Sequence, residues 1–171
     1  MNQHSILILN QEQIALKLER MAWQIWELLS SEQSVTLLGV EKGGVPLAQA
    51  LAKLLRKIST LEVKVLPLQL NKKEPLSAIT AIDEDLNGRP VVLVDDVANS
   101  GRTLLYALKP VLDYLPSRIL IAVLIERKHK AYPIVPDIVG HSIATTLHEH
   151  IVVDTTDNFI SGAYLQHHKE D

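Results

Sequence analysis

Apolar residues return every three or four positions in several stretches of the chain, and this spacing predicts amphipathic helices. Asn10 is a candidate N-cap for the first helix, and Pro46 lies in the first turn of the second, where proline is tolerated. Pro110 falls inside the third helix and predicts a kink there. The predicted helices cover residues 11–30, 45–58 and about 101–115.

Runs of apolar residues separate these helices and predict strands at residues 34–39, 61–68, 91–94 and 118–125, with shorter strands at 137–139 and 151–153. Because the central runs are apolar at consecutive positions, both faces of those strands should be covered, which is typical of a parallel sheet. The pattern therefore predicts an α/β protein with a doubly wound, mostly parallel sheet. The polar, turn-rich stretch 71–89 is predicted to be a mobile loop that forms a small hood or flap.

Length and composition narrow the class of protein. The 171 residues fit a single domain over positions 1–171. No apolar run reaches the roughly 20 residues that a membrane helix requires, and the first residues lack the basic segment of a signal peptide. We therefore expect a cytoplasmic protein without a membrane contact. Cysteine is absent, which excludes thiolate chemistry, and a net charge of −3 gives no general attraction to nucleic acids.

The densest group of chemically active residues follows the strand predicted at 91–94. Two adjacent carboxylates, Asp95 and Asp96, stand at its carboxyl end, where parallel sheets bind their ligands. Small residues at 98–101 let backbone amides approach a phosphate, and Thr103 adds a hydroxyl donor. Neighbouring carboxylates need hydrogen-bond donors or a cation, so a ribose diol or a magnesium ion fits them. The alternative is that one aspartate caps the next helix and the other is solvated.

The whole segment VVLVDDVANSGRT, residues 91–103, resembles the signature of the type I phosphoribosyltransferases, whereas a Walker loop would require glycine at the position of Asp96. The signature has four apolar residues, two acidic ones and a small-residue loop that ends in Thr/Ser-Gly-Lys/Arg-Thr. The resemblance implies that Asp95 and Asp96 bind the ribose hydroxyls of phosphoribosyl pyrophosphate and that residues 98–103 hold its 5′-phosphate. The glycine loop at 40–44 resembles the family's pyrophosphate loop, although a glycine pair after a strand is more often only a turn.

This resemblance implies a set of catalytic and donor-binding residues. Asp95, Asp96 and Lys42 are the expected catalytic residues. Magnesium is the expected cofactor, bound mainly through the substrate, with Asp95 and Asp96 as candidate ligands. The residues expected to bind the donor are Glu41, Lys42, Gly43, Gly44, Val97, Ala98, Asn99, Ser100, Gly101, Arg102 and Thr103.

The residues that bind the base are expected after the last long strand. The candidates are Arg127, Ile138, Val139, His148, His150 and Ile151. In the family, residues at the corresponding positions stack on the base or form hydrogen bonds to it. His148 and His150 alternate along an extended segment, so a metal pair is the alternative for these two.

Within the family, the order of segments most resembles the pyrimidine-operon regulators that are also uracil phosphoribosyltransferases. Hypoxanthine-guanine phosphoribosyltransferases share PDIVG at 136–140 and the Lys-Gly-Gly of 42–44, but they usually have an aspartate where this chain has Asn99. Asparagine cannot act as a general base, so a purine acceptor is less expected. The interpretation is a magnesium-dependent transfer of the phosphoribosyl group to a nucleobase nitrogen, with uracil as the first choice.

Two departures from these regulators keep alternatives open. The first helix has Ala15, Leu16 and Trp23 where they have two arginines and a histidine, so RNA is not an expected partner. The stretch 68–84 has Asn-Lys-Lys at 71–73 where such enzymes have Ser-Tyr or Tyr-Arg on the loop that closes over the transition state. A non-catalytic regulator that binds phosphoribosyl pyrophosphate or a nucleotide is therefore the alternative function. By analogy we expect a homodimer or a higher homo-oligomer.

Overall fold

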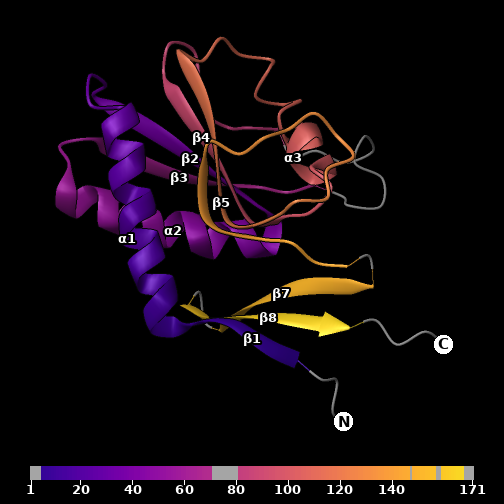
Figure 1. The fold of residues 1–171 in the computed structure, drawn as a ribbon. Helices are drawn as coiled ribbons and strands as arrows, with labels where there is room; N and C mark the ends of the chain where they lie inside the picture. The colour runs from indigo at the N-terminus through magenta and orange to yellow at the C-terminus, as the bar shows by residue number, and fades with distance from the viewer. Residues whose placement is uncertain (1–4, 71–80, 147, 157–158, 168–171) are drawn as a thin grey trace.

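The computed structural model describes residues 5–70, 81–146, 148–156 and 159–167 (Figure 1). The elements in this part of the chain are, in order, β1 (Ser5–Asn10), α1 (Gln11–Leu28), β2 (Ser34–Val40), α2 (Glu41–Ile58), β3 (Glu62–Leu68), β4 (Pro90–Ala98), α3 (Arg102–Ala107), β5 (Arg118–Arg127), β6 (Ile138–Ile143), β7 (Glu149–Thr156) and β8 (Phe159–His167). Five strands form one sheet in the order β3-β2-β4-β5-β6, and three form a second sheet in the order β1-β8-β7.

The five-stranded sheet is parallel throughout, as the apolar strand runs predict. Strand β4 shows why both of its faces must be covered. Val92 and Val94 belong to the core cluster under α1 and α2, whereas Val91 and Leu93 belong to the cluster under α3. All four side chains are fully buried. The predicted doubly wound α/β fold is therefore confirmed.

The start of α1 agrees with the sequence prediction. The Asn10 side chain accepts a hydrogen bond from the amide of Gln13 at 2.8 Å, and the Gln13 side chain accepts one from the amide of Asn10 at 2.9 Å. This reciprocal pair is a capping box, which satisfies two amides that the helix leaves without partners. Within the described ranges, no helix combines the length and the apolar character that crossing a bilayer requires.

Three of the differences between predicted and observed boundaries change the interpretation of the chain. Helix α2 begins at Glu41 rather than at residue 45, so the glycine loop forms its first turn. Strand β4 continues to Ala98 because it pairs with β5 beyond Asp95. Helix α3 ends at Ala107, so Pro110 lies beyond it and does not kink it. Proline has no amide to donate and its ring clashes with the preceding turn, which explains why the helix stops before that residue.

The three-stranded antiparallel sheet forms a small hood built from β1, β8 and β7, and the described residues 81–89 take no part in it. Strand β8 pairs with both β1 and β7, so the first and last described segments lie side by side (Figure 1). Leu9, Ile160 and Ala163 are buried in the same core cluster as α1 and α2. The sequence prediction included a short strand at 151–153 but missed β1 and β8.

The stretch predicted to be a mobile loop is described in part, since residues 71–80 lie outside the described residues. Residues 81–89 make several contacts with the body of the protein: Leu86 is fully buried, and the Tyr114 hydroxyl donates to the carbonyl oxygen of Ile82 at 3.0 Å. Lys64 pairs with Glu84 at 2.7 Å, and this hydrogen bond lowers the pKa of the Glu84 carboxyl. The mobility of the loop stays a prediction.

Candidate active site

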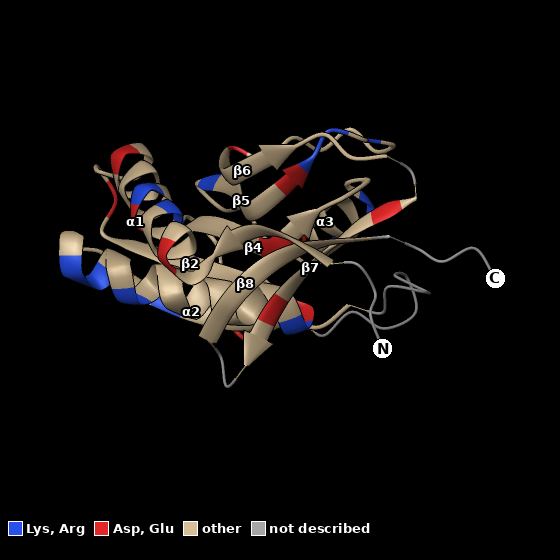
Figure 2. Cartoon of the chain, turned by 60° about the horizontal axis from the view of Figure 1, so that its bottom comes forward, with Lys and Arg blue, Asp and Glu red and all other residues tan. Residues whose placement is uncertain are grey.

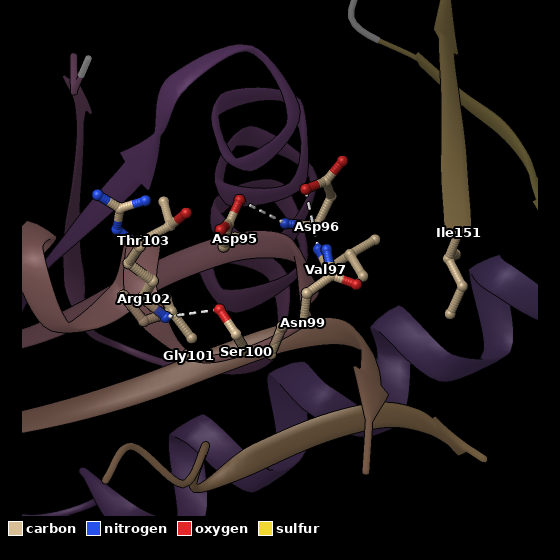
Figure 3. Close-up of a pocket in the computed structure, with 11 residues that line it drawn as sticks. Asp95, Asp96, Val97, Asn99, Ser100, Gly101, Arg102, Thr103 and Ile151 are labelled. Carbon is tan, nitrogen blue, oxygen red and sulfur yellow. Dashed lines mark hydrogen bonds between the residues drawn. The ribbon is translucent and has the colours of Figure 1, made fainter. Parts of the chain in front are cut away.

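The carboxyl end of β4 and the segment after it enclose a cavity of about 220 Å³ (Figure 3). Because β4 ends at Ala98 and α3 begins at Arg102, the connecting loop is only residues 99–101. Gly101 has a φ of 84°, a left-handed conformation that favours glycine, and it turns the chain into α3. The cavity is lined by Asp95, Asp96, Val97, Ala98, Asn99, Ser100, Gly101, Arg102, Thr103, Leu104 and Ile151.

Asp95 and Asp96 are held at this edge by backbone amides. The carboxylate of Asp95, a residue that is 3 % exposed, accepts the amide of Asp96 at 3.0 Å, and the carboxylate of Asp96 accepts the amide of Val97 at 2.8 Å (Figure 3). The N-cap position of α3 is Gly101, so neither aspartate occupies it. This placement disfavours the capping alternative, and both carboxylates stand beside the cavity as hydrogen-bond acceptors.

The glycine loop at 40–44 lies directly against this segment. A Cβ atom added at Gly43 would overlap the Asp96 carboxylate, and one added at Gly44 would overlap the carbonyl oxygen of Val94. Glycine therefore lets the first turn of α2 approach β4 closely. The two segments that the resemblance assigns to one donor molecule are neighbours in space, although α2 and β3 separate them along the chain.

Glu41 and Lys42 border a second cavity. It measures about 460 Å³ and is lined by Glu41, Lys42, Val45, Pro46, Pro67, Leu68 and Gln69. Glu41 has a φ of 47°, which is uncommon for a residue with a side chain, and its carboxylate accepts the amide of Leu70 at 3.1 Å. This residue ties the start of α2 to the chain that follows β3. Lys42 is exposed and is not among the residues that line the cavity at Asp95.

Charges of both signs meet at the carboxyl edge of the sheet: acidic positions occupy the end of β4, and β5 ends in an acidic and then a basic position (Figure 2). The basic residue, Arg127, donates from Nε to Thr145 Oγ1 at 2.7 Å, from Nη1 to Asn99 Oδ1 at 3.2 Å and from Nη2 to the Thr146 carbonyl at 2.9 Å. The guanidinium thus joins the loop at 99–101 to the segment that enters β7. Thr145 has no sequence signal, because only the fold brings it to Arg127.

The structure brings some of the expected base-binding residues to the cavity and leaves others elsewhere. Ile151 lines the cavity, and His150 precedes it on β7 and is half-buried. Ile138 is 1 % exposed in the core cluster under α1, and Val139 packs on the α3 side of the sheet, so these two do not line the cavity. The reason is that they lie on β6, which is separated from β4 by β5.

His148 is exposed in the turn before β7. Within the described residues, no group of three or more His, Cys, Asp or Glu side chains is placed to hold a metal ion. The structure therefore does not support the alternative of a metal pair formed by His148 and His150, since a stable site normally needs further ligands.

The connection between β5 and β6 supports the loop from outside, and the sequence analysis missed this contact. The amides of Ala131 and Tyr132 both donate to the carbonyl oxygen of Ser100, at 3.1 and 3.0 Å. A Cβ atom at Gly101 would stand 3.4 Å from the carbonyl oxygen of Tyr132, so the two segments are in close contact. This connection has no periodic apolar pattern that could have indicated its position over the loop.

Comparison with known proteins assigns the chain to a family. Residues 7–159 match the family model described as Phosphoribosyl transferase domain. Bifunctional protein PyrR of Limosilactobacillus reuteri is 34 % identical over 164 residues, which cover 88 % of this chain and 92 % of that protein. Bifunctional protein PyrR of a Picosynechococcus species is 36 % identical over 166 residues, which cover 92 % of this chain and 94 % of that protein.

Solved structures share the fold at lower identity. The hypoxanthine phosphoribosyltransferase of Trypanosoma cruzi has a TM-score of 0.80 at 15 % identity, with 95 % of this chain and 97 % of that chain covered. A hypoxanthine-guanine phosphoribosyltransferase of Bacillus anthracis has a TM-score of 0.72 at 20 % identity, with 91 % and 96 % covered. The chain therefore belongs to the phosphoribosyltransferases, enzymes of the glycosyltransferase class, and within that family it is similar to the PyrR proteins.

Proposed function

We propose that this phosphoribosyltransferase moves the 5-phosphoribosyl group of phosphoribosyl pyrophosphate to a ring nitrogen of uracil and releases pyrophosphate. In this reaction the bond from C1′ to the pyrophosphate oxygen breaks, a bond from C1′ to nitrogen forms, and the base loses its N–H proton. The observation that carries the proposal is the close approach of Gly43 to Asp96, because it brings the two expected donor-binding segments into contact.

The cavity beside β4 suits the ribose 5-phosphate half of the donor. A phosphate at the loop 99–101 would receive backbone amides, and a net hydrogen bond to a charged group contributes about 1.5 to 3 kcal/mol. Helix α3 has six residues, so its dipole adds less than these directed donors. Asp95 and Asp96 would accept the ribose hydroxyls, and their negative charge would stabilise the positive charge that develops at C1′.

Pyrophosphate would leave across the first turn of α2. Glu41 has a left-handed backbone conformation. Such strain costs of order 1 to 3 kcal/mol, persists only where the surrounding structure enforces it, and is common at functional sites. The adjacent Lys42 is exposed, so its ammonium can neutralise part of the charge on the leaving group.

The residues beside the cavity fit a magnesium ion that arrives mainly with the substrate. Since the described residues form no cluster of three protein ligands, protein oxygens alone would not complete its coordination. Asp95 and Asp96 are the residues that would share such an ion with the oxygens of the donor. When bound, the ion would neutralise charge on the departing pyrophosphate.

Two features of the cavity favour uracil as the acceptor. Asn99 cannot take a proton from a purine, whereas a carboxylate at this position could. Ile151 offers an apolar surface on which a flat ring can pack, with His150 beside it on β7. The similarity to the PyrR proteins supports the same acceptor, given the resemblance to regulators that are also uracil phosphoribosyltransferases.

A panel of radiolabelled bases tests the proposal. With phosphoribosyl pyrophosphate and magnesium, we expect uracil to yield uridine 5′-monophosphate and pyrophosphate. A nucleotide formed only from a purine would refute uracil as the acceptor, and no nucleotide from any base would refute the transfer. In calorimetry, Asp95→Asn combined with Asp96→Asn should abolish donor binding, whereas Asp113→Asn at an exposed turn should not. Donor binding without turnover would instead support the non-catalytic regulator.

A further inference from the structure

Arg127 is anchored to two other segments at the rim of the cavity. Each of its three guanidinium nitrogens donates a hydrogen bond to the protein, and the acceptors belong to Asn99, Thr145 and Thr146. The acceptor segment is fixed in turn, because the amide of Thr146 donates to the carboxylate of Glu149 at 2.6 Å. The guanidinium is therefore held in one orientation by the fold.

The contact with Arg127 determines which end of the Asn99 amide is engaged. A guanidinium only donates hydrogen bonds, so the amide atom that it meets must be the carbonyl oxygen, Oδ1. The amide nitrogen, which carries two N–H donors, is then the end left for a ligand. Asn99 is exposed and lines the cavity, so such a ligand can reach it.

We propose that Arg127 is a positioning residue for base selection: it orients Asn99 so that the side-chain N–H of Asn99 donates to a carbonyl oxygen of the nucleobase. The inference rests on the proposed function, because it states which edge of the base the same site recognises. It assigns Arg127 a role through Asn99 in place of the direct contact with the base that the sequence suggests.

The network argues against direct contact between Arg127 and the base. Thr145 is 9 % exposed, and its hydroxyl is paired with Nε of Arg127. If the guanidinium turned toward the base, that buried hydroxyl would lose its partner, and leaving a buried polar group unpaired is costly. A lysine at this position offers a single ammonium, which cannot reproduce the planar set of three contacts.

The proposal predicts that the site selects bases that carry a hydrogen-bond acceptor opposite the Asn99 N–H. A base with an amino group or a sulfur in place of the carbonyl leaves the Asn99 N–H without a good acceptor, and sites built on a hydrogen bond reject such analogues strongly. The useful probes are uridine 5′-monophosphate, cytidine 5′-monophosphate and 2-thiouridine 5′-monophosphate. Each analogue replaces one carbonyl oxygen of uracil, and binding of a nucleotide requires no turnover.

Calorimetry on the full chain measures the affinity of each nucleotide. We expect the wild type to bind uridine 5′-monophosphate about tenfold more tightly than at least one analogue, and Asn99→Ala and Arg127→Lys each to reduce this ratio to about twofold. Because both act through the same amide, the double variant should lose no more than either single one. Arg118→Lys is the matched control: this arginine starts the same strand, donates to the carbonyl of Leu28 at 2.7 Å and should keep the wild-type ratio.

Kinetics separate a positioning role from a structural one. In Arg127→Lys the KM for uracil should rise, while the KM for phosphoribosyl pyrophosphate stays at its wild-type value. Unchanged discrimination in either folded variant, additive losses in the double variant, or a wild type that does not distinguish the three nucleotides would each overturn the proposal. If Arg127→Lys does not fold, the nucleotide affinities of Asn99→Ala, a substitution at an exposed position, decide the proposal.

The same experiments distinguish this proposal from the proposed function. A wild type that turns over no base refutes the transfer to uracil, but the nucleotide affinities still decide the role of Arg127. A wild type that turns over uracil, with variants that discriminate as it does, keeps the function and refutes the positioning role.

Discussion

Replacing Gly43 by alanine tests the contact between the two donor-binding segments. The added Cβ would stand 2.7 Å from Oδ1 of Asp96 and closer still to Cγ and Oδ2, whereas an ordinary contact needs at least 3.4 Å. Either the carboxylate or the first turn of α2 must therefore move, by about 1 Å. Since a misplacement of about 1 Å can reduce a rate about 100-fold, we expect kcat/KM for phosphoribosyl pyrophosphate to fall by about that factor.

Gly88→Ala is the matched control for this variant. Gly88 has a φ of 65° and nothing lies within 4 Å of an added Cβ, so alanine there costs only backbone strain, about 1 to 2 kcal/mol. Overpacking at Gly43 should cost about 1 to 3 kcal/mol, so urea titration should find the two variants destabilised to a similar extent. Initial rates should separate them, with Gly88→Ala at the wild-type value. A folded Gly43→Ala protein with wild-type kcat/KM would refute the reasoning.

Three further predictions concern stability and RNA. Burial lowers the pKa of His141, so as the pH falls below the unfolded-state pKa of about 6.5 the unfolded chain binds a proton more readily than the folded one, and the free energy of unfolding should decrease. In urea titrations at several pH values, His141→Gln should weaken this dependence of the free energy of unfolding on pH. An equally steep dependence in the variant would contradict the prediction. Asp137→Ala removes the carboxylate that accepts the amide of Ile121 at 2.8 Å and should lower the free energy of unfolding by about 1 to 2 kcal/mol, whereas a loss near zero in urea titration would argue against that bond. Leu16 and Trp23 are 64 % and 50 % exposed on α1 and carry no charge that could bind RNA phosphates. A gel shift with a pyrimidine-operon leader hairpin should therefore show no complex. A complex whose affinity falls steeply with salt would disprove the prediction.

The central sheet was predictable because its strands are buried on both faces and therefore appear as apolar runs. Strands β1 and β8 were missed because they pair with each other from opposite ends of the chain, as Ile6 does with Leu165, and no local pattern shows such a partner. The third helix was predicted too long because the apolar spacing continues past its end. Val111 is fully buried although it follows α3, so the side chain keeps its place in the core after the backbone has left the helix.

The donor half of the site was predictable because its residues are contiguous in the sequence, as Asp95 and Asp96 are. The base half depends on tertiary contacts. Ile138 was expected at the base because it follows the last long strand, but its strand direction and sheet order place it in the core. The link from Arg127 to Asn99 joins residues from different elements, and its role depends on which amide atom faces the guanidinium. No property of Arg127 or Asn99 alone indicates this link.

The hood also fixes the order in which a newly synthesised chain can complete this site. The two aspartates, the glycine loop and the strands between them are present once α3 has been made. Ile151 comes later, on β7, which pairs with β8, and β8 pairs in turn with β1. Strand β1 therefore cannot pair until β8 (Phe159–His167) has been synthesised, and pairing over such a separation in sequence is slow. A nascent chain would acquire the residues for the sugar phosphate well before the surface on which a base would rest.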